Sequence, residues 1–358
     1  MSADRLQGLA TRFAALKIDA LLVSALPNVR YLSGFTGSNG LLVVSASGAA
    51  TLFTDPRYAI QATEQSASCA PKIVRGPLSA AVSHFVVRKR WRRIGFEKAR
   101  MIYSDYAALD ESLPSGAALK PMPPLVEQLR AVKSEDELTL IRRSVLTNSQ
   151  ALAATLPKIR AGVSESEIAA ELEYQMRLHG ADKPAFETIV AAGARTALPH
   201  AEPGALKLQS DHLLLIDMGA SQNGYASDMT RMFSLGKPAR KLRTMYNAVL
   251  EAQLAAIARV RPGVTAAQVD RAARSVLASH GLGAAFIHST GHGLGLEIHE
   301  APRIGAKDNT ALEAGMAITI EPGAYIEGFG GVRIEDTIVV TASGCEPLTP
   351  TSKELVIL

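Results

Sequence analysis

The stretch RAGVSESE (residues 160–167) returns in altered form as RPGVTAAQ (residues 261–268). The matched positions differ by 101 residues, and each copy is followed at the same distance by a histidine and a glycine, at 179–180 and at 280–281. In both copies a hydroxyl residue precedes Glu or Gln by three positions, which is typical of a helix that begins with a capping box. Two similar helix caps could arise by chance, but the shared His-Gly pair favours an internal duplication.

The duplicated unit predicts the fold of the C-terminal part. Each copy has a helix before it, a capped helix within it and strand-like segments after it. We therefore expect an α+β domain in which two helix-helix-hairpin units form one curved antiparallel sheet with the helices outside it. A site between the two halves would take ligands from both.

The N-terminal part has a different pattern. Short apolar runs at 19–24, 40–45 and 50–55 alternate with helical stretches at 57–66 and 78–87, which predicts a small α/β domain with a mixed sheet. We expect the proline-rich PMPPLVEQLR (121–130) to connect two domains, and SEDE (134–137) to begin a long helix with a capping box. The predicted domains are residues 1–128 and 129–358.

Composition limits the class of protein. The chain has 358 residues, is 47% hydrophobic and carries a net charge of +4. It contains no run near the roughly 18 apolar residues that a membrane span needs, and its first residues lack the apolar core of a signal peptide. Cys69 and Cys345 lie too far apart in the sequence to suggest a disulfide framework or a thiolate zinc site. We therefore expect a cytoplasmic protein with no membrane partner.

One basic run, RKRWRR (88–93), is typical of a nucleic-acid patch and also of the solvated end of a surface helix. Because it is short and stands alone, we prefer the second interpretation and expect no nucleic-acid partner.

Two predicted hairpins carry paired acids. In LLLIDMGASQNGYASDMTRMF (213–233), a turn at Gln222–Gly224 would bring Asp217 and Asp228 onto adjacent antiparallel strands. In AITIEPGAYIEGFGGVRIEDTIVV (317–340), Glu321 and Glu335 are equally distant from Gly328, so they would face each other. A single acid of this kind could be an exposed strand end or an ion-pair partner. Four converging buried carboxylates instead favour binding of divalent metal ions.

The stretch HSTGHGLGLEIHE (288–300) contains three histidines separated by glycines. It resembles a phosphate-binding loop only weakly, because no strand-turn-helix context surrounds it. A lone histidine is more often a structural residue than a ligand. Three histidines in the same half as the paired glutamates favour a site, and one imidazole would complete a set of hard ligands for a pair of divalent ions.

Taken together, Asp217, Asp228, His292, Glu321 and Glu335 resemble the five-ligand pattern of the pita-bread metallopeptidases, family M24, which includes methionine aminopeptidase, aminopeptidase P and prolidase. NVRYLSGFTG (28–37) and KPAFETIVAAG (183–193) resemble the branch that contains prolidase and aminopeptidase P. The likeness implies a pita-bread catalytic domain preceded by a smaller creatinase-like domain.

The resemblance also implies roles for single residues. One metal ion would be held by Asp228, His292, Glu321 and Glu335, and the other by Asp217 with Asp228 and Glu335. Manganese is the preferred ion because oxygen ligands dominate, although zinc and cobalt suit such a site as well. Glu321 would accept a proton from the attacking water.

Further side chains would contact the substrate. His200 and His299 match histidines that contact the scissile region, and His288 matches a substrate-side histidine. Arg303 is a candidate for binding the substrate carboxylate, with a surface arginine as the alternative. Arg333 would line the substrate site or support the ligand carboxylates, with a cross-strand ion pair as the alternative.

The implied activity is hydrolysis of Xaa-Pro dipeptides by a homodimer. The main alternative is aminopeptidase P activity on longer proline-containing peptides. A metal-free creatinase-type hydrolase and a binding module without activity fit less well, because the complete ligand set is present. Methionine aminopeptidase would not normally carry the N-terminal domain.

Overall fold

A computed structural model of the chain describes residues 2–358, and its contacts divide the chain into two compact units, one ending at Arg130 and one spanning Ala131–Leu358. Within the described residues no helix is long and apolar enough to cross a lipid bilayer.

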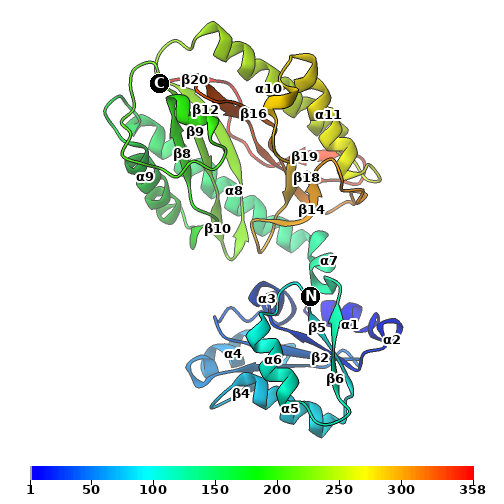
Figure 1. Cartoon of the computed structure of the whole chain (residues 1–358). Helices are drawn as coiled ribbons and strands as arrows, with labels where there is room; N and C mark the ends of the chain where they lie inside the picture. Colours follow the sequence, from blue (N-terminus) through cyan, green and yellow to red (C-terminus); the bar gives the residue numbers. More distant parts are fainter. Residues whose placement is uncertain (1) are drawn as a thin grey trace. The chain divides into compact units, whose positions relative to one another are not determined.

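The first unit is built on one six-stranded sheet with the order β4-β3-β2-β1-β5-β6 (Figure 1). β1 pairs antiparallel with β2 and parallel with β5, so the sheet is mixed, as predicted. Its strands are β1 (Ala20–Val23), β2 (Leu41–Ser45), β3 (Ala50–Thr54), β4 (Ala70–Ile73), β5 (Arg93–Glu97) and β6 (Ala118–Met122). Its helices are α1 (Ser2–Ala10), α2 (Phe13–Leu16), α3 (Leu26–Ser33), η1 (Pro56–Tyr58), α4 (Ala59–Gln65), α5 (Leu78–Lys89), α6 (Tyr103–Ser112) and α7 (Leu125–Ala131).

The proline-rich stretch and the basic run of this unit both form parts of helices and strands. The proline-rich stretch predicted as a connection forms the end of β6 and then α7. Pro121 fits β6 because this is an edge strand, and Pro123 and Pro124 precede a helix, where a missing N–H is tolerated. The basic run 88–93 begins in the last turn of α5 and ends at the start of β5, as the helix-end interpretation predicts.

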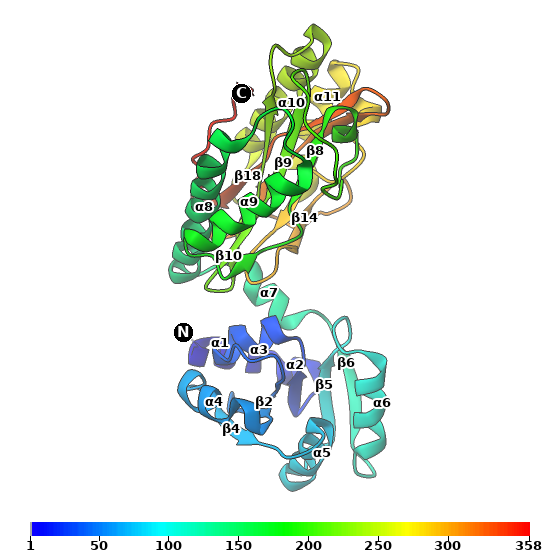
Figure 2. The same cartoon turned by 90° about the vertical axis from the view of Figure 1, so that its left-hand side faces the viewer.

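The second unit carries four long helices in two pairs. α8 packs on α9, and α10 packs on α11. Figure 1 shows the α10–α11 pair beside the C-terminal strands, and Figure 2 shows α8 and α9 beside the strands of the first half. The helical segments are α8 (Glu135–Thr155), η2 (Leu156–Lys158), α9 (Glu165–Leu178), η3 (Gly193–Ala197), α10 (Arg240–Arg259), α11 (Ala266–Ser279) and η4 (Gly283–Ala285).

The predicted helix starts are confirmed. α8, α9 and α11 each begin with a complete capping box, at Ser134, Ser164 and Thr265 respectively. α9 and α11 are the duplicated helices of the sequence repeat. They start and end at equivalent positions because the same cap chemistry recurs.

The strands of this unit form two main antiparallel layers, ordered β20-β12-β9-β8 and β14-β13-β15-β18-β19, with smaller sheets beside them. Only β20 pairs in parallel, with β12. The strands are β7 (Lys183–Pro184), β8 (Ile189–Ala192), β9 (Leu213–Met218), β10 (Ala220–Gln222), β11 (Tyr225–Ala226), β12 (Met229–Ser234), β13 (Gly291–Gly293), β14 (Glu300–Ile304), β15 (Ala317–Ile320), β16 (Gly323–Ile326), β17 (Gly330–Arg333), β18 (Asp336–Val340), β19 (Cys345–Pro347) and β20 (Val356–Ile357).

The two layers meet at one main-chain hydrogen bond, in which the N–H of Glu335 donates to the carbonyl of Thr230 over 3.3 Å. We expected one curved sheet, and the structure has two sheets joined at this seam. The main hydrophobic core extends across the seam. It includes Leu215 and Met232 from the first half and Ile318 and Ile338 from the second.

Candidate active site

Asp217 and Asp228 are placed by the first hairpin. Its turn is formed by Asn223 and Gly224, both with positive φ (50° and 78°), as the Asn-Gly signal predicts. Asp217 lies on β9 and Asp228 immediately precedes the antiparallel β12, and the two residues are 8% and 5% exposed. Two aspartates are therefore buried side by side on one sheet.

Glu321 and Glu335 are placed by the second hairpin. Glu321 directly follows β15, and Glu335 lies between β17 and β18. The pairing of Ile320 with Asp336 puts the two glutamates opposite each other, equally far from Gly328. Glu335 is almost fully buried, with 1% of its surface exposed.

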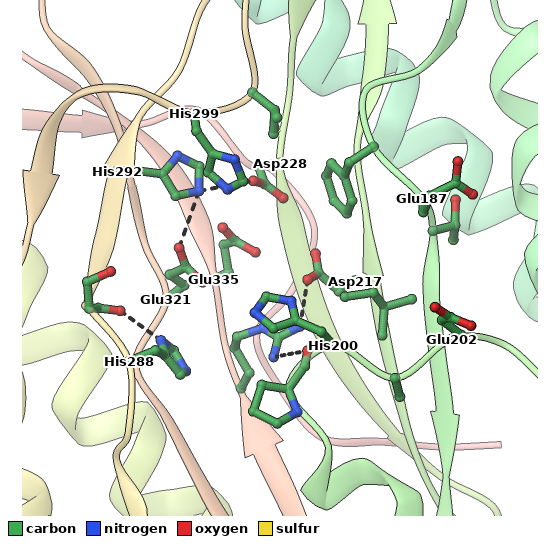
Figure 3. Close-up of a pocket in the computed structure, with 18 of the residues that line it drawn as sticks. Glu187, His200, Glu202, Asp217, Asp228, His288, His292, His299, Glu321 and Glu335 are labelled. Atoms are coloured by element: carbon green, nitrogen blue, oxygen red, sulfur yellow. Dashed lines mark hydrogen bonds and ion pairs between the residues drawn. The ribbon is translucent and has the colours of Figure 1, made fainter. Parts of the chain in front are cut away.

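His292 on β13 completes the cluster (Figure 3). Its Nε2 lies 3.6 Å from Asp228 Oδ2 and 3.4 Å from Glu321 Oε1, and Nδ1 is 3.0 Å from the carbonyl oxygen of Gly293. Donation from Nδ1 to that carbonyl would leave the Nε2 lone pair directed at the carboxylates, which is the usual arrangement for a metal-ligating histidine. Ligand atoms of Asp228, His292 and Glu335 lie within 4.8 Å of one another.

Arg333 contacts the carboxylates of the cluster directly and through a hydroxyl group. It is 3% exposed, and its Nη2 donates to Asp217 Oδ2 over 2.5 Å. Its Nε donates to the hydroxyl of Thr230 over 3.0 Å, and that hydroxyl donates to Glu335 Oε2 over 2.7 Å. Its Nη1 donates to the Tyr325 hydroxyl over 2.8 Å. This one guanidinium thus connects acids from both halves of the fold.

Burial and mutual repulsion raise the pKa values of these acids. Burial, followed by the nearby Asp217 carboxylate, raises the pKa of Asp228 well above its ordinary value. Burial and the Asp228 carboxylate do the same for the pKa of Glu335. Burial raises the pKa of Glu321 to about 7, although Arg333 opposes the shift. These carboxylates therefore lack enough positive charge within the protein to remain ionised together.

The donor set fits divalent cations. Asp217 Oδ1 and Glu335 Oε1 are buried and have no hydrogen-bond partner in the described part of the chain, and both belong to the acidic cluster. Burial lowers the pKa of His292, so its ring is neutral and can offer a lone pair. Four carboxylates and one imidazole form a hard, oxygen-rich set that suits Mn²⁺, and Zn²⁺ or Co²⁺ as well.

The cluster lies in a cavity of about 1000 Å³. All ten side chains proposed from the sequence contribute to the wall of this cavity: His200, Asp217, Asp228, His288, His292, His299, Arg303, Glu321, Arg333 and Glu335. His200 and His299 are exposed, and the His299 ring lies edge-on to the His292 ring with 4.4 Å between centroids. Arg303 on β14 is exposed too.

His288 has both ring nitrogens occupied by protein groups. Its Nε2 is 2.9 Å from the Tyr325 hydroxyl, and its Nδ1 is 2.8 Å from the Ser289 carbonyl oxygen. Burial lowers the pKa of His288 to about 4. The Tyr325 hydroxyl accepts from Arg333, so its own hydrogen is available for His288 Nε2. The ring is therefore neutral and fixed in orientation, with its proton on Nδ1.

Tyr325, Thr230 and Thr319 hydrogen-bond to predicted site residues and were not themselves identified from the sequence. Tyr325 connects His288 to Arg333, and Thr230 connects Arg333 to Glu335. The Thr319 hydroxyl donates to Glu321 over 3.1 Å and accepts from the main chain of His292. No local motif distinguishes these residues, although all three occupy strands that also position ligands.

Comparison with known sequences gives two family matches. The sequence model of Metallopeptidase family M24 matches residues 139–342, and that of the Creatinase/Prolidase N-terminal domain matches residues 5–132. Together they span both compact units.

Individual relatives match along almost the whole chain. The uncharacterized peptidase YqhT of Bacillus subtilis (strain 168) is 40% identical, covering 99% of this chain and all of the relative. The solved structure of an Xaa-Pro dipeptidase from Bacillus anthracis has a TM-score of 0.97 at 39% identity, with full coverage of both chains. That of an X-Pro aminopeptidase from Thermotoga maritima MSB8 has a TM-score of 0.90 at 34% identity, covering 97% of this chain and all of that one.

Proposed function

Because this chain belongs to metallopeptidase family M24, we propose that it hydrolyses the peptide bond between an N-terminal residue and proline, and that its substrates are Xaa-Pro dipeptides. The observation that carries the proposal is the convergence of four carboxylates, three of them on buried residues, and a neutral histidine on one cavity, with two buried carboxylate oxygens that have no hydrogen-bond partner among residues 2–358. The likeness to the Bacillus anthracis Xaa-Pro dipeptidase supports the choice of substrate.

We propose that two divalent cations bind at this cluster. Asp228, His292, Glu321 and Glu335 would hold one, and Asp217 with Asp228 and Glu335 the other. When bound, such cations polarise a substrate carbonyl and lower the pKa of a water molecule. The hydrogen bond from Arg333 to Asp217 orients this carboxylate and leaves its Oδ1 available as a ligand.

Glu321 would accept the proton of the attacking water. Burial raises the pKa of Glu321 to about 7 in the metal-free protein, and bound cations would favour the ionised carboxylate, which is the form that can accept a proton. The Thr319 hydroxyl donates to Glu321 Oε1, which stabilises one orientation of the carboxylate. Proton transfer would thus occur at a fixed oxygen on the cavity wall.

His200 and His299 would act on the substrate itself. Both rings are exposed on the cavity wall and could donate hydrogen bonds to the oxyanion that forms at the scissile carbonyl, or to the departing nitrogen. The proline nitrogen leaves as a secondary amine, which is a poor leaving group unless it is protonated. A donor on this wall is therefore required by the chemistry. His288 and Arg333 would shape the substrate side of the cavity through their shared contact with Tyr325.

Arg303 would bind the C-terminal carboxylate of a dipeptide. It is exposed on the cavity wall, and its position on β14 pairs with His292 on β13, which places it one strand away from the metal cluster. A guanidinium can bind a carboxylate through two parallel hydrogen bonds.

The deciding assay compares release of alanine from Ala-Pro and from Ala-Pro-Ala, each with manganese supplied. We expect faster cleavage of Ala-Pro, and we expect Arg303→Ala to raise KM for Ala-Pro at least tenfold, the equivalent of about 1.4 kcal/mol. Lys307→Ala, which changes a basic residue of the same segment outside the cavity wall, should leave KM unchanged. Full dipeptide activity in Arg303→Ala would exclude this residue as the carboxylate anchor.

Aminopeptidase P activity is the second candidate. The likeness to the Thermotoga maritima X-Pro aminopeptidase favours it, because that structure is also matched over its whole length. Faster release of alanine from Ala-Pro-Ala than from Ala-Pro would establish this alternative.

We further propose manganese as the working ion, a homodimer as the assembly and the cytoplasm as the compartment. The oxygen-rich ligand set supports manganese. The resemblance to prolidases supports the homodimer, and light scattering on the purified protein would test it. The compartment is supported by Cys69 and Cys345, both free thiols.

A further inference from the structure

The segment 193–204, which carries His200, is held at both ends and at two points between them, where the N–H of Gly331 donates to the Thr196 hydroxyl over 2.9 Å and Arg333 Nη1 donates to the carbonyl of Pro199 over 3.2 Å. It starts in η3 and continues without regular structure to Gly204. Among residues 2–358, no protein group hydrogen-bonds to the ring of His200. The ring is therefore available to a substrate, and its position depends on how the segment around it is anchored.

Both ends of the segment are anchored on one side chain, Glu165, the first residue of α9. The N–H of Ala192, just before the segment, donates to Glu165 Oε1 over 2.8 Å. The N–H of Gly204, at its end, donates to Glu165 Oε2 over 3.0 Å. The Glu165 side chain is fully buried. The two oxygens of one carboxylate thus bring the two ends of the segment together.

Arg195 extends this anchor to the neighbourhood of His200. Its Nε lies 3.1 Å from both oxygens of Glu165, and its Nη2 donates to the carbonyl of Glu202 over 2.6 Å. Glu202 is two residues from His200 in the chain. The path from Glu165 to the segment beside His200 therefore consists of two charge-assisted contacts, which are stronger than neutral ones.

The chemistry of this anchor requires a carboxylate. Every group that contacts Glu165 here is a donor: two main-chain N–H groups and one guanidinium. An ionised carboxylate offers only acceptors, whereas an amide would turn an NH₂ group toward one of these N–H donors. A buried N–H left without a partner is costly, so that end of the segment would move.

We propose that Glu165 is a positioning residue for His200, setting where its imidazole lies in the cavity. This rests on the substrate-contacting role that the proposed function gives to His200. Glu165 itself does not line the cavity, so it acts only through the segment.

The second half of the fold uses the same kind of anchor. Asp270, buried on α11, accepts from both the N–H and the hydroxyl of Thr290, and it pairs with Arg274. Arg274 in turn donates to the carbonyls of Phe286 and His288. In both halves, a buried acid on the capped helix and an arginine together hold a segment that carries a cavity histidine.

The first test is Glu165→Gln in the full-length, manganese-loaded protein. We expect kcat for Ala-Pro to fall between about tenfold and 10²-fold, because a displacement near 1 Å at a catalytic group has an effect of this size. Bound manganese should stay at the wild-type level. Glu167→Ala is the matched control, since Glu167 lies in the same helical turn and, among residues 2–358, its side chain hydrogen-bonds only to Ser164. It should lower stability and leave kcat unchanged.

A double-mutant cycle tests whether Glu165 affects kcat through His200. Once His200→Ala has lowered kcat, adding Glu165→Gln should lower it less than twofold further, because the group that Glu165 positions is gone. An equal loss in both backgrounds would overturn the proposal. An unchanged kcat in His200→Ala alone would instead remove the role of His200, so the two failures can be told apart.

A measurement that does not depend on turnover completes the test. In metal-free protein, amide hydrogen exchange of segment 193–204 should quicken in Glu165→Gln and stay unchanged in Glu167→Ala. If Glu165→Gln does not fold, Arg195→Gln replaces it, because Arg195 is partly exposed and its loss leaves both main-chain contacts of Glu165 in place. A wild-type kcat together with unchanged exchange in Arg195→Gln would contradict the proposal.

Discussion

Asp228 lies in surroundings that disfavour its negative charge. It is 5% exposed, and its pKa is raised first by burial and then by the carboxylates of Asp217 and Glu321. Removing its charge would therefore stabilise the metal-free protein. With cations bound, the same charge is needed, because Asp228 is the proposed ligand of both ions together with Glu335.

We expect Asp228→Asn to abolish hydrolysis of Ala-Pro and to make the metal-free protein more stable than the wild type at pH 8. The amide keeps the shape of the side chain and removes a buried negative charge beside other carboxylates. Activity assays with added manganese and thermal unfolding with a chelator would measure the two effects.

Asp182→Asn is the matched control. Asp182 accepts from the N–H of Gly224 at the tip of the same hairpin, outside the cavity, and its amide can accept in the same way. It should retain full activity. Wild-type turnover with normal metal content in Asp228→Asn would remove Asp228 from the site.

At the scale of the strands, Arg231 stabilises the seam between the two sheets. Side chains alternate along a strand, so Arg231 and its neighbour Thr230 point to opposite faces of β12. Its Nη1 donates to the carbonyl of Glu335 over 2.5 Å, and its Nη2 donates to Asp336 over 2.7 Å. It also donates to the carbonyls of Thr351 and Ser352. One buried cation thus holds two ligand-bearing strands and the C-terminal segment together.

We expect Arg231→Leu to lower the free energy of unfolding by about 3 kcal/mol or more, because it leaves several buried acceptors unpaired and breaks a buried ion pair. Arg142→Leu is the control: its ion pair with Glu346 is exposed on both sides and should contribute less than about 1 kcal/mol. Urea unfolding of the metal-free protein would compare the two variants. Equal losses of the free energy of unfolding would contradict the proposed role of Arg231 at the seam.

The features predicted from the sequence are those that neighbouring residues determine. The Asn223-Gly224 turn and the cap pairing of Ser164 with Glu167 arise within a few residues, and the structure confirms both. The family matches and the structural likenesses confirm the predicted fold class.

The residues that were missed depend on distant partners. Thr230 contacts Glu335, 105 positions away, and Glu165 binds Ala192, 27 positions away, and Gly204, 39 positions away. Such pairs form only after the strands have paired, so a single sequence contains no periodic signal for them. The roles proposed for the site residues remain predictions for the experiments above.

At the scale of the whole molecule, the acidic cluster links stability to pH and to metal. The pKa of Glu321 in the folded protein is about 7, above its ordinary value of 4.5. Its contribution to stability is therefore fully present below pH 4.5 and is lost as the pH rises through 7. The raised pKa values of Asp228 and Glu335 act in the same direction. Burial lowers the pKa of His288 to about 4, so His288 changes stability only below about pH 6.5.

We expect the metal-free protein to lose about 1 kcal/mol or more of stability between pH 6.5 and pH 8, since each carboxylate that ionises only in the unfolded state has an effect of this order. Saturating manganese should remove this loss, because it binds the ionised forms. Thermal unfolding with a chelator and with manganese, at several pH values in this range, would measure both.

Glu321→Gln should show a flatter pH profile without metal than the wild type, because one titrating group is gone. The same slope with chelator and with manganese would mean that the cluster does not bind the ion.

The division of the five proposed ligands between the two halves of the duplicated fold also affects when the protein can acquire its metal. During synthesis Asp217 and Asp228 leave the ribosome first, and two carboxylates alone compete poorly with water for a divalent cation. The set is complete only when Glu335 has been translated and the seam at Thr230 has closed. The folded site can therefore take up its metal only after Glu335 has been translated and the two halves have joined.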